Sequence, residues 1–239
     1  MNDHGYDQER RTFLKRMAMM GALGSAGAGF LVRQVMAMGQ AGQLPEGVRR
    51  VQGTVQVNGA PATVGSVVFP GDVITTGSAS LGVFVIGKGA FLIRENARIE
   101  LGGDKTGKQP GTAKIVTSLK VAAGKVLSVF GSGGKRIETV TAVAGTRGTG
   151  IFVEMISDVT YICLCYGKAD IDAKAYPGER ESLETKHHEE PYYVLPEGMK
   201  QGFLEAPMLN HTDEDLIMLE SLGGRVPPFG GKSFSSGGY

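Results

Sequence analysis

The sequence predicts an all-β protein: a roll, a solenoid-like fold or a sandwich of many short strands, followed by an irregular C-terminal extension with one short helix. Three observations predict this fold class. Glycine accounts for 37 of 239 residues, about twice its average usage. Turn residues close short apolar segments roughly every 8 to 12 residues, a spacing typical of all-β domains. No helical period is visible between Val51 and Ile171.

The N-terminal segment, residues 1–41, has the pattern of an export signal. A basic head precedes an apolar run, rich in alanine and glycine, from Met17 to Val32. The pattern resembles the twin-arginine (Tat) signal of bacterial proteins, which implies passage through the Tat translocase into the periplasm. Membrane contact is expected only if the signal stays uncleaved and anchors the chain to the inner membrane. The residues that carry the motif are Arg10, Arg11, Phe13, Leu14 and Lys15.

The body of the chain is a series of predicted short strands. Asn58-Gly59 suits a hairpin turn and Pro70-Gly71 suits a type II turn, so strands are expected beside both. Residues 114–121 alternate between apolar and polar side chains, which indicates one buried face. Residues 102–111 form a polar, glycine-rich loop. The predicted strands cover residues 51–57, 64–69, 81–86, 90–94, 97–101, 114–121, 125–130, 135–142, 149–156 and 160–166.

The stretch Lys135–Val153 is predicted to be the centre of the β-domain. It is interpreted as a strand, a corner of small residues at 143–148 and a second strand from Thr149. Its glycines permit a positive φ or a close approach of backbone. Arg147 carries the only charge at the corner. It is either an internal anchor for carbonyls or a carboxylate, or a recognition group at a partner surface.

Several pieces of residues 48–172 together resemble a known domain. They are Gly53-Thr54-Val55, the run PGDVITTG at 70–77, Leu127-Ser128-Val129 and, above all, VAGTRGTGIFV at 143–153. This combination resembles the FecR domain, the periplasmic module of iron-dicitrate type regulators. The resemblance implies that a short motif fixes the strand corner. The motif is either structural or used for interaction. Its residues are Gly145, Thr146, Arg147, Gly148 and Thr149.

The resemblance to the FecR domain implies a non-enzymatic envelope sensor or protein-interaction module that works by signal transduction. The sigma-regulating cytoplasmic domain of that family has no counterpart before the arginine pair, so direct control of a sigma factor is not expected. The expected partner is another envelope or membrane protein, bound at a strand edge or a loop. Two alternatives stay open: a periplasmic protein that binds a metal or a small ligand, and a structural envelope protein that binds glycan.

The C-terminal third differs in composition from the β-domain. After Ile171 it is more charged and contains proline, which predicts an irregular extension over residues 173–229. Within it, Thr212 is a natural N-cap followed by acidic residues, so a short amphipathic helix is predicted at 212–222. Its apolar stripe is expected to pack on the β-domain or to meet a partner. The tail, 230–239, is rich in glycine and serine and is predicted to be disordered.

Charge and catalytic pattern exclude several classes of function. The 25 Lys and Arg nearly cancel the 24 Asp and Glu, so no overall field favours nucleic acid. No serine, histidine and acid fall in a supported catalytic arrangement, and no carboxylate pair stands out on one face. We therefore expect no enzyme activity, no catalytic residue and no cofactor.

The cysteines and histidines are the residues that could suggest a metal. Cys163 and Cys165 point to one face of a predicted strand, too far apart for an easy disulfide, and are interpreted as buried small side chains. Thiol chemistry and metal binding stay open for them. His187, His188 and His211 are candidate metal ligands. However, adjacent histidines in a strand or loop are expected to point apart, and no HExxH or CxxC spacing supports a site.

Overall fold

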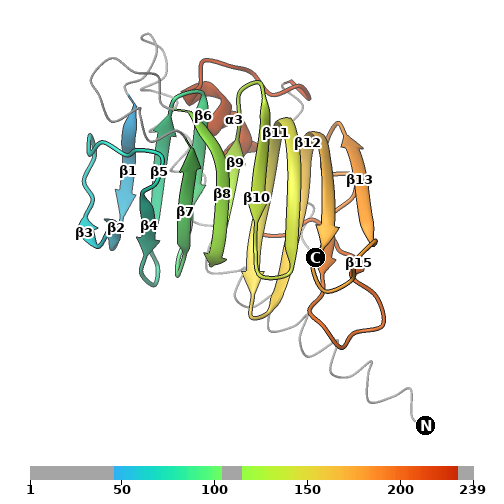
Figure 1. Cartoon of the computed structure of the whole chain (residues 1–239). Coiled ribbons are helices and arrows are strands. Elements are labelled where there is room, and N and C mark those ends of the chain that lie inside the picture. Colours follow the sequence, from blue (N-terminus) through green and yellow to red (C-terminus); the bar gives the residue numbers. More distant parts are fainter. Residues whose placement is uncertain (1–45, 104–114, 231–239) are drawn as a thin grey trace.

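The described part of the chain is one curled β-sheet with a single helix. The structure is a computed structural model and describes residues 46–103 and 115–230. Within these residues, 15 strands share one sheet, and helix α3 (Asp213–Leu222) lies against it (Figure 1). The predicted all-β fold with one short helix is confirmed. The export signal, most of the loop 102–111 and the tail from residue 231 lie outside the described residues.

The strands follow one another along the chain with short connections. They are β1 (Gly47–Gln52), β2 (Val55–Val57), β3 (Ala60–Pro61), β4 (Val73–Thr76), β5 (Leu81–Ile86), β6 (Gly89–Ile93), β7 (Arg98–Gly103), β8 (Val116–Ala123), β9 (Lys125–Val129), β10 (Gly134–Glu138), β11 (Ala142–Ile156), β12 (Val159–Ala173), β13 (Arg180–Thr185), β14 (Tyr192–Val194) and β15 (Phe203–Glu205).

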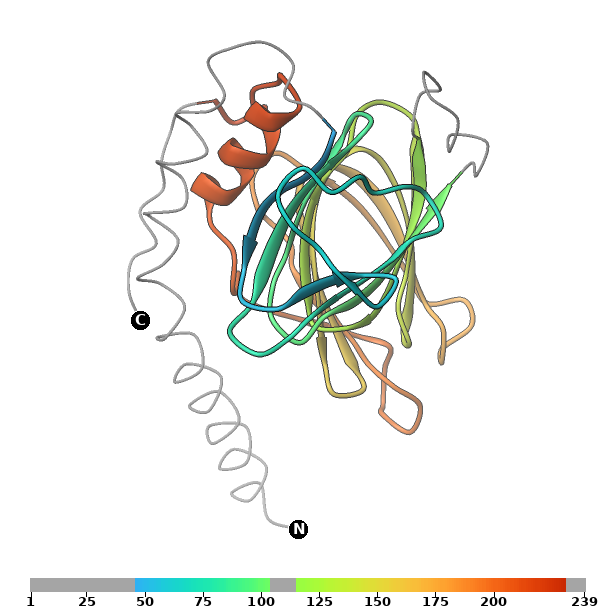
Figure 2. The same cartoon turned by 90° about the vertical axis from the view of Figure 1, so that its left-hand side faces the viewer.

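The sheet curls so that one of its faces becomes the interior. Its main path runs β1-β5-β6-β9-β11-β10-β8-β7-β4-β2-β3, and β12 adds β13 and β14 beside β11. Figure 2 shows the strands curving around the interior, with α3 on the outer face. Among the described residues, no helix is both long and apolar enough to cross a membrane.

The central strands bury both of their faces, against different partners. In β5, Phe84 belongs to the interior core, whereas its neighbours Val83 and Val85 belong to a second apolar cluster that includes residues of α3. The same alternation recurs in β12, where Leu164 points inward while Cys163 and Cys165 point outward. Two buried faces explain why these strands have few polar residues.

The glycine-rich centre lies inside a long strand, and this differs from the predicted corner. The chain reverses earlier, at residues 139–141, between β10 and β11. Residues 143–147 of β11 pair with β10 and residues 150–154 pair with β9, while β12 runs along the other edge. Gly148 has φ +58°, and the register shifts between Arg147 and Gly150. The glycines therefore form a bulge at which β11 changes partner.

Other segments differ from the prediction as well. Residues 51–57 are not one strand but are divided between β1 and β2, with Gly53 at φ +69° between them. Residues 64–69 form a loop rather than a strand, with Val64 and Val67 exposed. This loop is held by backbone bonds such as that from the Val48 N–H to the Ser66 carbonyl, 2.8 Å. The predicted irregular extension contributes β13, β14 and β15 to the same sheet, because β12 continues to Ala173 and offers its edge to β13 and β14.

Helix α3 begins where the sequence predicts. The Thr212 side chain accepts a hydrogen bond from the Asp215 N–H, and the Asp215 side chain accepts one from the Thr212 N–H. This reciprocal capping box satisfies two backbone N–H groups at the start of the helix. Asp215 also forms an ion pair with Arg94, 2.7 Å, at the end of β6. The apolar side of the helix packs on β6 and β9, as expected for its stripe.

Candidate metal centre

Strand β12 presents two thiols on the outer face of the sheet. Cys163 and Cys165 are two residues apart, so their side chains share one face, and both are completely buried. They are free cysteines. On one edge Cys163 lies opposite Phe152 of β11. The other edge of β12 pairs with β14 at 160–162 and with β13 at 167–172, so the connection between β13 and β14 passes beside the cysteines.

That connection carries His187 and His188. The His188 N–H donates to the Cys165 carbonyl, 3.0 Å, and its Nδ1 lies 3.4 Å from the Cys163 Sγ. The Nε2 atoms of His187 and His188 lie 2.8 and 3.2 Å from the same carboxylate oxygen, Oδ1 of Asp213. The expectation that the two rings point apart is wrong, because His188 adopts a left-handed backbone with φ +53°, which changes the direction of its side chain.

His211 comes from the coil just before α3. Its Nδ1 lies 2.6 Å from the Leu209 carbonyl oxygen and its Nε2 lies 3.0 Å from the His188 Nδ1. The ring stacks on Phe152, with centroids 4.5 Å apart and planes 12° apart. His211 is 5% exposed. Stacking and hydrogen bonding thus hold the ring edge that carries Nε2 toward the cysteines.

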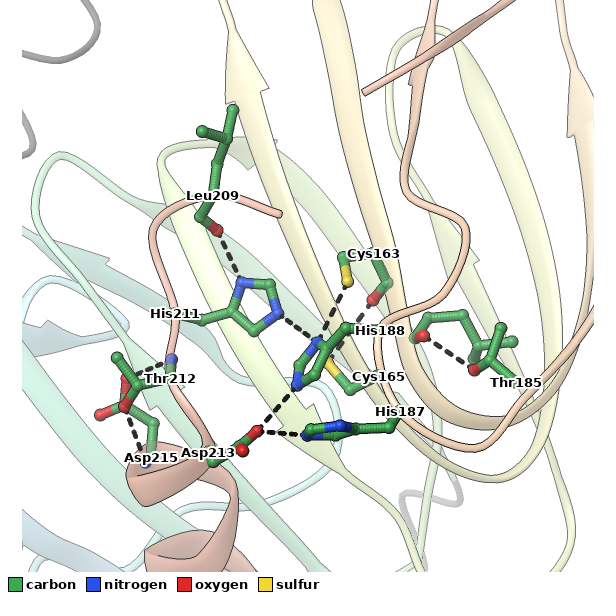
Figure 3. Close-up of polar contacts among 11 residues, drawn as sticks. Cys163, Cys165, Thr185, His187, His188, Leu209, His211, Thr212, Asp213 and Asp215 are labelled. Atoms are coloured by element: carbon green, nitrogen blue, oxygen red, sulfur yellow. Dashed lines mark hydrogen bonds and ion pairs between the residues drawn. The ribbon is translucent and has the colours of Figure 1, made fainter. Parts of the chain in front are cut away.

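Four side chains from three segments converge on one point, as Figure 3 shows. Cys163, Cys165, His188 and His211 each offer one ligand atom, and these atoms all lie within 4.8 Å of one another. In a tetrahedral zinc site with two sulfur and two nitrogen ligands, neighbouring ligand atoms are about 3.3 to 3.8 Å apart. The two distances measured from the His188 Nδ1, 3.4 and 3.0 Å, are close to this range.

The positions of the protons on His188 and His211 also favour a metal ion at this point. The Leu209 carbonyl can only accept a hydrogen bond, so the His211 Nδ1 carries a proton, and the Asp213 carboxylate accepts from the His188 Nε2 in the same way. In the neutral rings, the facing atoms His188 Nδ1 and His211 Nε2 then both present lone pairs, 3.0 Å apart. A cation or an extra proton between them would remove this repulsion, and two sulfurs within the same reach favour a metal cation.

The two thiols have opposite tendencies to ionise. Hydrogen bonding from the Cys165 side chain holds the pKa of the Cys163 thiol well below its usual value despite burial. Burial raises the pKa of the Cys165 thiol well above its usual value. Since the thiolate is the form that binds a metal, Cys163 is prepared as a ligand, and Cys165 is expected to lose its proton when the metal binds.

The four candidate ligands are enclosed by supporting residues. The carboxylate of Asp213, which is 3% exposed, contacts the rings of both His187 and His188. Phe229 lies over the His187 ring, with centroids 4.6 Å apart, and also contacts Tyr166. His187, His188 and Asp213 also lie close enough to form a ligand group. Because the His188 Nε2 is directed at Asp213, its Nδ1 is the atom left to bind a metal. We therefore infer that Asp213 and His187 do not bind the metal themselves, and that the Asp213 carboxylate orients the ligand His188.

The residues of the FecR-like motif lie elsewhere, on the bulge of β11. Thr146 and Thr149 are buried, whereas Gly145, Arg147 and Gly148 are exposed. The side chain of Arg147 has no hydrogen bond or ion pair with another described residue, so the structure offers no support for an internal anchor. The predicted candidates thus separate into three groups: His188 and His211, which meet the cysteines; His187, which contacts Asp213; and the motif, which lies apart from the cysteines.

Comparisons with known proteins give a limited result. No protein-family model matches the chain, and no curated protein sequence does either. Two crystal structures of a candidate anti-sigma factor from Parabacteroides distasonis, at 1.65 and 2.50 Å resolution, resemble it with 11% sequence identity and a TM-score of 0.43. The similarity covers 56% of this chain and 58% of that chain, so this chain spans little more than half the length of that protein. The resemblance to the FecR domain stays a prediction.

Proposed function

We propose that this protein binds one transition-metal ion, with Zn²⁺ as the best fit, through Cys163, Cys165, His188 and His211. The observation that carries the proposal is that two imidazole nitrogens face each other across 3.0 Å beside two buried sulfurs. Two sulfur and two nitrogen ligands in a tetrahedral arrangement suit zinc. The sequence left open a periplasmic protein that binds a metal through His187, His188 and His211. The proposed site is of this kind, but it uses only His188 and His211 of the three histidines, together with the two cysteines.

The proposed site suggests a non-enzymatic role. Catalytic zinc sites keep one position open for water or substrate, whereas structural and sensory sites fill all four with protein ligands. Here all four positions are filled by buried side chains, and Phe152 and Phe229 lie beside the site. We therefore propose a metal-binding module of the cell envelope, exported through the Tat signal, with no reaction of its own.

The proposal is tested by measuring the metal itself. The full chain, purified with and without added Zn²⁺, is expected to retain one equivalent of zinc after desalting. Replacement of zinc by Co²⁺ is expected to give the visible absorption of a tetrahedral thiolate complex. A chain that retains no zinc, or whose Co²⁺ form shows only the weak spectrum of an octahedral ion, would contradict the proposal.

The outer carboxylate gives the first variant to examine. Asp213→Asn removes the charge that orients His188, and we expect the Zn²⁺ affinity to fall by about 10- to 100-fold because loss of such a partner weakens the ligand. Affinity is measured by competition with a chromophoric chelator. Glu214→Gln is the matched control, since it removes an acidic charge from the neighbouring residue, and it should bind zinc like the unmodified chain.

A second candidate function is favoured by the exposed bulge of β11. Arg147 is exposed there beside Gly145 and Gly148, a position suited to contact with another envelope protein. This supports the hypothesis of an envelope sensor or interaction module. Crosslinking in the envelope fraction should capture a specific membrane or receptor protein with the exported chain. The form retained in the cytoplasm by Arg10→Lys and Arg11→Lys should not capture it, and the absence of any specific product would contradict this role.

A further inference from the structure

The metal centre joins the sheet to the last part of the described chain. We propose that metal binding fastens the C-terminal strap, residues 206–229, onto the outer face of the sheet, so that metal loss loosens it. This inference rests on the proposed zinc site. Three ligands belong to β12 and the connection after β13, but His211 belongs to the strap. Asp213, which orients His188 from outside, belongs to it as well.

The first part of the strap depends on side-chain contacts. Between residues 206 and 212, the one backbone hydrogen bond to the sheet region is from Ala206 to Pro191, 2.9 Å, as far as the described residues show. Beyond it, the Tyr161 hydroxyl contacts Pro207 and Leu209, both at 3.0 Å. A coil held in this way opens more readily than a strand within a ladder. The ligand that it carries is therefore the one that can move.

The sheet side of the site cannot relax in the same way. Cys163 and Cys165 lie in β12, which pairs with β11 over nearly its whole length. With neither a cation nor an extra proton between them, the lone pairs of His188 and His211 oppose each other across 3.0 Å in a buried site, where an uncompensated polar contact is costly. Moving His211 relieves this contact. Because its ring is stacked on Phe152 and hydrogen-bonded to the Leu209 carbonyl, the movement breaks contacts that hold the coil leading into the N-cap of α3.

The strap covers an extended apolar surface. Beneath it, the sheet contributes Val83, Val85, Leu92, Leu127 and Val129 to a cluster completed by residues of α3. The helix side supplies Leu216, Met218, Leu219 and Leu222.

Polar contacts hold the far part of the strap independently of the metal. The Glu220 carboxylate accepts hydrogen bonds from the Tyr166 hydroxyl and from Arg225. Arg225 also donates to the Lys88 carbonyl, 2.8 Å.

Nearer the site, the Asn210 side chain donates to Glu154, 2.7 Å, and Asp215 pairs with Arg94, 2.7 Å. Loosening is therefore expected to begin at His211, between these two contacts, and to reach the first turns of α3 as the pair with Arg94 opens.

Hydrogen–deuterium exchange of the full chain tests this inference. With one equivalent of Zn²⁺, peptides covering residues 206–219 are expected to exchange about tenfold or more slowly than after chelation, because ligand binding suppresses local opening. Peptides from β5 and β6 should change little. Binding of a hydrophobic dye should rise on chelation, since the apolar surface below the strap becomes accessible.

The variant Cys165→Ser separates an effect of the metal from an effect of strap packing. Cys165 lies in β12 and makes its hydrogen bond with Cys163, not with the strap. If the strap is fastened by the metal, Cys165→Ser should give the fast exchange of the chelated chain, and added zinc should not restore protection.

The outcomes distinguish this inference from the proposed function. One equivalent of bound zinc with unchanged exchange of residues 206–219 would overturn the strap proposal and leave the metal site standing. Uniformly faster exchange across β5, β6 and the strap would also overturn it, since zinc would then stabilise the whole fold. A chain that binds no zinc would contradict both the proposed metal site and the strap proposal.

Discussion

Replacing Cys163 with serine is expected to abolish tight zinc binding. Cys163 is the thiol whose pKa is lowered by its neighbours, so it supplies the thiolate that the site needs first. Loss of a direct ligand should reduce the affinity by more than the roughly 10- to 100-fold that loss of an outer partner costs. The melting temperature should also stop responding to zinc, whereas a site filled at about 1,000 times its Kd gains about 4 kcal/mol of stability.

The measurement compares the two proteins with and without zinc. Isothermal titration reports the affinity, and thermal unfolding reports the zinc-dependent gain in stability. Circular dichroism of the zinc-free proteins serves as the control, because serine has nearly the size of cysteine and the sheet should stay intact. Zinc binding by Cys163→Ser with unchanged affinity would show that the metal lies elsewhere or does not use this thiol.

Gly150→Ala is expected to destabilise the fold by about 2–3 kcal/mol, the upper part of the range for overpacking in a well-packed core. A Cβ at Gly150 would lie 2.4 Å from the Cε1 of Tyr166 and 3.1 Å from the Cδ2 of Leu216. The Tyr166 ring cannot move away freely because its hydroxyl binds the buried Glu220 of α3. Chemical denaturation of the zinc-loaded proteins measures the difference in free energy of unfolding.

Gly145→Ala is the matched control within the same run of residues, 143–153. A Cβ at Gly145 would meet no atom within 4 Å. Its backbone lacks a positive φ, so alanine should change stability by less than about 0.5 kcal/mol, as is usual for a surface position. Equal losses for the two variants would show that this run needs its glycines for a reason other than the close approach of Tyr166.

The fold could be predicted well where local chemistry decides it. Segments such as 81–86 and the helix at 212–222 have clear boundaries in the sequence, because turn residues or a capping box mark their ends. Strand β13 was missed because residues 180–185 are mostly polar. Only Leu183 and Thr185 are buried there, and the rest of the strand is held by pairing with β12. Such pairing is a long-range effect that local composition does not reveal.

The metal centre could be predicted only in fragments. The sequence shows two cysteines that share a strand face and histidines that lie well after them, but the distance between them along the chain hides their contact. His188 reaches the site through a left-handed backbone conformation, which is uncommon for residues other than glycine. A Cys-X-Cys pair on an apolar strand, together with a histidine beside a helix N-cap, was the available signal. It becomes specific only when β12 and the strap are placed together.

The origin of the ligands from three segments has a consequence for biosynthesis. Cys163, Cys165 and His188 leave the ribosome before His211, and every strand of the described sheet is synthesised before His211 as well. A nascent or truncated chain that ends before His211 can hold the sheet residues but only three of the four ligands. Under the proposed site, tight capture of a metal ion therefore reports that translation has passed the last strand and that the end of the chain has folded back onto the sheet.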